Sequence, residues 1–216
     1  NPIFSTEKTL SNNKLAMLKL LAEVNDPDVA FEQIAQTVGT DVGLTHKLLS
    51  AINHPSTGIP HPVETLKEAV NFMGLKRLKF WVNMMMLSSM EDVPAELLVT
   101  ALVRAKFLEG MAEKMGLNSE KDRYFMAGLF STLNAFLKIP MADVVDQLPL
   151  SQEVKAALLD QSGEMGRVIW VVRALEQGNT RIDIPGRDNI DLMVISSAYM
   201  AANAWSYKTI TSLNAA

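Results

Sequence analysis

The chain has 216 residues, of which 48% are hydrophobic, and a formal net charge of −4. This size is enough for a substantial buried core. The absence of cysteine excludes disulfides, thiolate metal sites and cysteine nucleophiles. The net negative charge argues against general nucleic-acid binding, because neutralising phosphates requires an excess of Lys and Arg.

Membrane and secretion signals are missing from the sequence. No apolar run approaches the ~18 residues needed to cross a bilayer. The segment that begins at Asn1 has no basic region followed by an apolar core, as a secretion signal would. We therefore expect a cytoplasmic protein without membrane contact.

The first part of the chain is predicted to be a lead-in followed by short helices. Residues 1–12 lack hydrophobic periodicity, so they are predicted to be a linker or the end of an upstream domain. Asp28 and Asp41 are predicted N-caps. Helices are expected over 13–24, 28–38, 41–52, 64–73 and 75–87.

The helices over 28–53 admit a second interpretation as a DNA-binding helix-turn-helix. The second of these helices carries only His46 and Lys47 as basic groups, together with the acidic Asp41. That set is small for reading the major groove, so an ordinary helical corner is preferred and nucleic acid is not an expected partner.

The segment 53–62 is predicted to be a loop, because its three prolines and one glycine prevent a continuous helix. His54 and His61 flank this loop. They lack the further ligands that a metal site requires, so they are interpreted as polar loop residues.

The second half of the chain is also predicted to be helical, and no strand is expected anywhere. Helices are predicted over 95–115, 123–139, 141–148, 151–159, 167–176 and 190–213. The helix over 123–139 is expected to be continuous and central. Gly128 in its interior is expected to let another helix approach, since glycine costs about 1 kcal/mol there.

The run Phe-Met-Ala-Gly-Leu-Phe-Ser-Thr over 125–132 resembles the helix of HD-type metal-dependent phosphohydrolases that normally contains Gly-Leu-Leu-His-Asp. Ser131 and Thr132 stand in place of the His-Asp dyad. The helix over 95–115 resembles the one that carries an early metal-binding histidine, but its matching neighbourhood contains Arg104 instead. This pattern resembles the HDOD family, the HD-related output domains, in which the helical scaffold persists without the metal ligands.

Other segments carry the same resemblance over residues 10–178. Asn53 before the loop and Gly74 after the following helix match the HDOD pattern, and the runs 10–15 and 147–159 are similar to HDOD domains that follow an EAL domain. The resemblance implies an all-α multi-helix bundle. Its expected parts are one HDOD domain over 13–213, with an N-terminal subdomain (13–90), a modified HD-like bundle (95–178) and a closing helix (190–213).

The residues themselves indicate no catalytic site and no cofactor. Neutral hydroxyls bind divalent cations poorly, and a cation such as Arg104 repels them. No serine with a neighbouring base and no phosphate-binding glycine loop is recognisable. The chain is therefore expected not to be an enzyme; any phosphodiesterase activity would belong to an EAL domain outside it.

A basic cluster remains as a candidate interaction surface. Lys76, Arg77 and Lys79 lie beside Trp81, a combination that can hold a phosphate or an acidic partner and stack on a ring. An ordinary solvated helix face is the simpler interpretation.

The resemblance implies a non-catalytic regulatory domain of bacterial signalling, linked to cyclic di-GMP. Its expected partners are other signalling proteins or an upstream EAL domain, and a homo-oligomer is compatible with this role. The alternatives are a divergent metal-dependent phosphohydrolase and the helix-turn-helix DNA binder.

Overall fold

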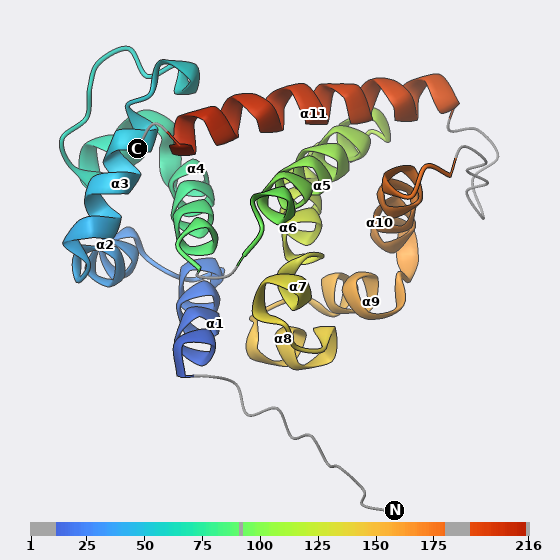
Figure 1. Cartoon of the computed structure of the whole chain (residues 1–216), viewed down its shortest axis with the longest axis horizontal. Coiled ribbons are helices and arrows are strands. Elements are labelled where there is room, and N and C mark those ends of the chain that lie inside the picture. The colour runs from blue at the N-terminus through green and yellow to red at the C-terminus, as the bar shows by residue number, and fades with distance from the viewer. Residues whose placement is uncertain (1–11, 91–92, 180–190, 215–216) are drawn as a thin grey trace, which may run out of the picture.

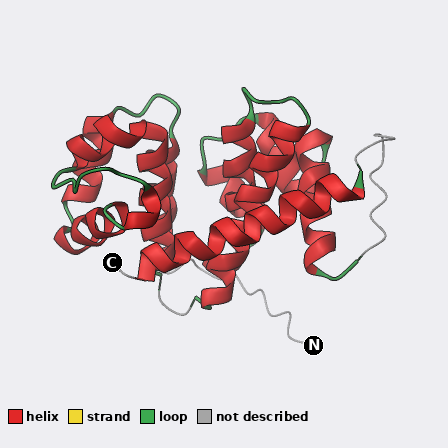
Figure 2. Ribbon diagram, turned by 90° about the horizontal axis from the view of Figure 1, so that it is seen from above, coloured by secondary structure: helices red, strands yellow, loops and turns green. Residues whose placement is uncertain are grey.

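The computed structural model describes residues 12–90, 93–179 and 191–214, and within these ranges the regular structure is entirely helical (Figure 2). The predicted all-α fold is therefore confirmed. The elements are α1 (Asn12–Asn25), α2 (Phe31–Gly39), α3 (Val42–Ile52), the short 3-10 helix η1 (Pro55–Thr57), α4 (Leu66–Ser88), α5 (Ala95–Lys114), α6 (Lys121–Phe130), α7 (Leu133–Leu137), α8 (Met141–Gln147), α9 (Gln152–Asp160), α10 (Gly163–Glu176) and α11 (Leu192–Asn214).

The helices form two lobes that α11 spans (Figure 1). Helices α1–α4 form the N-terminal lobe, and α5–α10 form the second lobe. Helix α11 packs along α5 and reaches α3 and η1, so it contacts both lobes. The predicted linker over 1–11 and the start of the predicted last helix at Ile190 lie outside the described residues.

Two predicted caps in the N-terminal lobe have different outcomes. Asp41 caps α3 as predicted, and its carboxylate accepts a hydrogen bond from the Leu44 amide at 2.9 Å. The predicted cap at Asp28 is wrong, because α2 begins only after Ala30. The Gln33 side chain instead accepts a hydrogen bond from the amide of the N-cap residue Ala30, at 2.9 Å.

Helix α4 contains the predicted break at Gly74. This residue has φ 79° and ψ 160°, a conformation that glycine adopts without the penalty a side chain would add. The two halves of α4 therefore follow one another with a bend and no linker. The second half carries Asn83, which is fully buried and exchanges hydrogen bonds of 2.8 and 3.0 Å with Asn25 of α1. This amide pair fixes α1 against α4.

The predicted continuous helix over 123–139 is wrong, because α6 ends at Phe130 and α7 begins at Leu133. The hydroxyl of Ser131 donates to the Gly128 carbonyl and that of Thr132 to the Leu129 carbonyl, each at 2.7 Å. Such bonds compete with the main-chain hydrogen bonds that would continue the helix.

The burial of α6 also differs from the face that hydrophobic spacing suggests. Ala127 and Gly128, on the small side, are buried against α5, while Phe125 and Met126 are only partly buried. The small residues therefore lie in the buried face of α6, and Phe125 and Met126 are only partly covered.

Gly128 of α6 lies directly against the backbone of α5. A Cβ atom added to Gly128 would lie 2.6 Å from the Arg104 carbonyl oxygen and 2.7 Å from the Ala105 backbone. These are main-chain atoms of a long helix, so they cannot move aside as a flexible side chain does. The expected role of Gly128 in admitting another helix is confirmed, and that helix is α5.

No single helix in the described ranges is long and apolar enough to cross a membrane. The segments 121–137 and 141–147 together reach the required length and apolar composition, but the chain bends by 118° between them.

We predict that Gly128→Ala lowers the free energy of unfolding by about 2–4 kcal/mol, because the added methyl group forces α5 and α6 apart. The matched control is Gly110→Ala in α5, where an added Cβ meets nothing within 4 Å. That change should be neutral or stabilise by up to about 1 kcal/mol. Urea denaturation of both variants measures the difference, and equal stability would contradict the contact.

Candidate functional site

Two of the three positions that resemble degenerate HD-ligand positions come together in the structure. Arg104 lies on α5, and Ser131 follows the last residue of α6. The Arg104 Nη1 atom donates to the carbonyl oxygen and to the hydroxyl oxygen of Ser131, both at 3.2 Å. Thr132 is buried and does not share this contact; its hydroxyl donates to the Leu129 carbonyl.

A carboxylate from α10 completes the cluster. Arg104 makes a two-point ion pair with Glu176, with Nε to Oε1 at 2.8 Å and Nη2 to Oε2 at 2.7 Å. Only 14% of the Arg104 side chain and 22% of the Glu176 side chain are exposed. Planar two-point pairs are the strong form of this interaction, so the Arg104–Glu176 pair ties α10 to α5.

The residues at this position do not fit a divalent metal ion. Arg104 brings a permanent positive charge, its carboxylate partner is already engaged, and the Ser131 hydroxyl donates to a backbone carbonyl. The histidines are in the other lobe, at positions 46, 54 and 61. Among the described residues, no three His, Asp or Glu side chains gather as a metal site would require.

Glu176 is absent from the sequence-based set of site residues. It lies 72 positions after Arg104 near the end of an amphipathic helix, where a glutamate is expected on the solvated side. No spacing or motif distinguishes it from other surface glutamates, so only the packing of α10 on α5 reveals its role.

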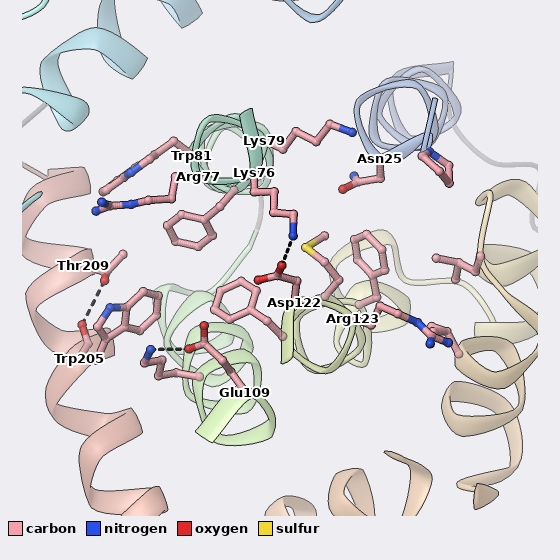
Figure 3. A pocket seen from close by; sticks show the side chains of 18 of the residues that line it. Asn25, Lys76, Arg77, Lys79, Trp81, Glu109, Asp122, Arg123, Trp205 and Thr209 are labelled. Carbon is pink, nitrogen blue, oxygen red and sulfur yellow. Dashed lines mark hydrogen bonds and ion pairs between the residues drawn. The ribbon is translucent and has the colours of Figure 1, made fainter. Parts of the chain in front are cut away.

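A second candidate site is a cavity of about 770 Å³ between the lobes, which we call the interlobe groove. One wall is α4, and Asn25 and Pro27 lie at its edge. The opposite wall comes from α5, α6, α9 and α11 (Figure 3). Clefts of roughly 300–1,000 Å³ at the junction of structural units are the usual places for small-molecule binding.

The basic cluster singled out in the sequence lines this groove. Lys76, Arg77 and Lys79 all contribute to it (Figure 3). Trp81 also lines the cavity, but it is only 5% exposed and packs edge-on to Phe80. The expectation that Trp81 offers a ring for stacking is therefore wrong, because its ring is part of the core.

Other aromatic rings line the groove instead. Phe80 of α4, Phe125 of α6 and Trp205 of α11 are partly exposed and contact one another, with centroid distances of 5.4–6.0 Å. Sequence reasoning missed this set because its members come from helices far apart in the chain. The sequence contained one indication of this set. Phe125 is a large apolar residue on a helix where Gly128 was expected to form the close helix contact, so Phe125 was available for a different surface.

Charged side chains connect the two walls of the groove. Lys76 of α4 forms an ion pair with Asp122 of α6, and Figure 3 shows this pair reaching across the opening. The Lys76 side chain is 82% exposed, so the pair contributes little to stability. Lys106 pairs with Glu109 on α5, and its Nζ lies 5.5 Å from the Trp205 ring centroid.

Arg77 and Lys79 interact with backbone oxygens. Arg77 donates to the Thr57 carbonyl at 3.3 Å and Lys79 to the Asp26 carbonyl at 3.0 Å. Burial lowers the pKa of Lys79, and the nearby Asp26 carboxylate opposes this shift only in part. Neither side chain forms an ion pair with a carboxylate within the described ranges.

The helix-turn-helix interpretation concerns α2 and α3. His46 and Lys47 are exposed on α3. DNA binding by this corner stays an alternative prediction from the sequence.

The all-helical scaffold has the fold class expected of an HD-related output domain. Residues 13–159 match the model of the HDOD domain, and the chain belongs to this family. The resemblance identified from the sequence is thereby confirmed.

Two curated proteins and one solved structure are similar to this chain. The chain is 27% identical over 179 residues to the cyclic di-GMP phosphodiesterase CdgJ of Vibrio cholerae, covering 82% of this chain and 41% of that protein. It is 21% identical to YuxH of Bacillus subtilis, and the match covers 92% of this chain and 49% of that protein. The chain thus spans less than half the length of these curated relatives. A putative phosphohydrolase from Shewanella amazonensis shares the fold, with a TM-score of 0.61, 13% identity, and 92% and 93% of the two chains covered.

We predict that Arg104→Met lowers the free energy of unfolding by about 2–4 kcal/mol, because it leaves the largely buried Glu176 carboxylate without its partner. Adding Glu176→Gln should recover part of that loss. Lys76→Ala, which removes the exposed pair with Asp122, should cost no more than about 1 kcal/mol. A double-mutant cycle by urea denaturation measures these values, and additive single effects would show that the pair is not coupled.

Proposed function

We propose that this chain is a non-catalytic regulatory domain of a cyclic di-GMP signalling protein. It acts through contacts with an adjoining domain or another protein. The observation that carries the proposal is the Arg104–Glu176 ion pair, placed where the chain resembles metal-dependent hydrolases.

The chemistry of that cluster supports a role without catalysis. Metal-dependent hydrolysis requires ligands that hold a cation, which lowers the pKa of a bound water and so generates the nucleophile. Arg104 and Glu176 neutralise each other, and Ser131 supplies only a neutral hydroxyl already bonded to a carbonyl. The cluster therefore serves to join three helical segments.

The relatives support the signalling context. CdgJ is named a cyclic di-GMP phosphodiesterase, and this chain covers 41% of it. We propose that the EAL-type activity of such proteins lies in the part outside the matched region, and that an EAL domain is a partner of this chain. A cytoplasmic location and self-association are compatible with this role.

The arrangement in two lobes supports a mechanism by change of shape. Helix α11 contacts both lobes, and exposed ion pairs such as Lys76–Asp122 are weak enough to break. A partner that binds one relative position of the lobes more tightly shifts the population toward it. Regulation then passes through packing and requires no bond chemistry.

The non-catalytic role predicts that the purified chain does not hydrolyse cyclic di-GMP or nucleoside phosphates when supplied with Mn²⁺, Mg²⁺ or Fe²⁺. Turnover by liquid chromatography and metal content by elemental analysis check this together. Hydrolysis accompanied by stoichiometric metal would establish the alternative, a divergent phosphohydrolase.

The regulatory role predicts that the chain changes the activity of an EAL phosphodiesterase domain from the same cell. Adding the purified chain at saturating concentration should change the initial rate of cyclic di-GMP hydrolysis at least two-fold, since a shift of ~0.4 kcal/mol doubles or halves the population of a sparsely populated active state. Albumin at equal concentration is the control. An unchanged rate with every EAL domain of that cell contradicts the proposal.

A further inference from the structure

The charge of the interlobe groove differs in sign from that of the whole chain. Its lining contains six cationic side chains and two carboxylates, and cations remain in excess when Arg123, which pairs with Glu120 and Glu153 outside the lining, is left out. The whole chain, in contrast, carries a net charge of −4. Clustering of one sign in a concave site focuses the field and attracts ions of the opposite sign. The groove is therefore suited to an anion.

The two cations best placed to bind an anion are Arg77 and Lys79. Both donate to backbone carbonyls, which are weaker partners than a charged oxygen. They lie on α4 toward opposite ends of the groove, and Figure 3 shows Arg77 on the side of Trp205 and Lys79 on the side of Asn25. An anion in the groove gains charged hydrogen bonds without first breaking an ion pair with either residue.

The groove also offers aromatic surface. Phe80, Phe125 and Trp205 come from three helices of both lobes and remain partly exposed. Planar bases stack on such rings, and the stacking tolerates any base because every base has a π face. Rings flanked by cations match a ligand that joins a planar base to phosphate.

We propose that the interlobe groove binds a nucleotide, with its base stacked on the ring of Trp205 beside Phe80 and Phe125 and its phosphate held by Arg77. The cavity of about 770 Å³ has room for a ligand of this class. The ligand contacts both lobes, so binding fixes their relative position. This assignment does not depend on the proposed regulatory function, because binding is measured directly.

Removing the ion pair across the groove should increase the affinity for a nucleotide, which gives a test of the proposal. Asp122 places a carboxylate inside an anion site and engages Lys76. Removing its charge with Asp122→Asn lowers the repulsion and frees Lys76 for the phosphate. Nucleotide affinity should therefore rise about three- to ten-fold.

Isothermal titration calorimetry of the full chain with GTP, ATP and cyclic di-GMP tests the site, and guanosine and pyrophosphate serve as probes of base and phosphate alone. At least one nucleotide should bind at micromolar concentration, more weakly at high ionic strength. Guanosine and pyrophosphate should each bind at least ten-fold more weakly. Comparing the affinities for GTP, ATP and cyclic di-GMP shows whether the site prefers a mononucleotide or a cyclic dinucleotide.

Two pairs of variants locate the binding. Arg77→Ala and Trp205→Leu should each lower the affinity for the most tightly bound nucleotide about ten-fold. The matched controls are Arg173→Ala, on the exposed side of α10, and Tyr207→Leu, which is 75% exposed on α11 and does not line the groove. Both should bind as the unchanged chain does, and thermal unfolding confirms that each variant is folded.

Three outcomes would overturn the assignment: no binding of any of the three nucleotides at millimolar concentration, pyrophosphate binding as tightly as the nucleotides, or equal losses in groove and control variants. The second outcome would indicate a simple anion site, and the third would place the nucleotide elsewhere. None of them bears on whether the chain regulates an EAL domain.

Discussion

The close approach of α5 and α6 at Gly128 is the constraint on which the rest of the structure depends. Because the glycine has no side chain, the α5 backbone at Arg104 and Ala105 lies where a Cβ would be. This contact sets the depth and register of the two helices. It brings Arg104 beside Ser131, and it also turns Phe125 and Met126 away from the tight contact and toward the interlobe groove.

The largely buried Arg104 guanidinium brings a fixed positive charge to α5, and Glu176 balances that charge from α10. In a hydrolase, a metal ion would supply the positive charge and several ligands would surround it. Here one arginine and one glutamate join α5 to α10.

The two lobes share α11 and a groove lined by partly exposed rings and mostly positive side chains. Tight packing within each lobe contrasts with the exposed ion pair that crosses between them. Packed units joined in this way can move relative to one another at their junction. Ligand binding and partner regulation would then act on the same boundary.

Much of the helical content was accessible from the sequence. Hydrophobic periodicity with Pro and Gly as breaks gave the order of the helices, including the break at Gly74 and the cap at Asp41. The same reasoning failed at Ser131 and Thr132, where local hydroxyl hydrogen bonds end a helix that its apolar spacing would continue. It also failed at Asp28, where Gln33 provides the competing cap.

The sequence by itself determined the fold class and the family resemblance, because both follow from short-range spacing and from which residue types are missing. The resemblance to HD-type hydrolases also drew attention to Arg104 and Ser131, and the sequence showed Lys76, Arg77 and Lys79 as a basic cluster. Only the tertiary structure decided that Glu176 pairs with Arg104, that Trp81 is buried, and that Phe125 and Trp205 face the basic cluster. These are contacts between helices distant in the chain, and side-chain burial and pairing there depend on how helices pack, which local sequence patterns do not encode.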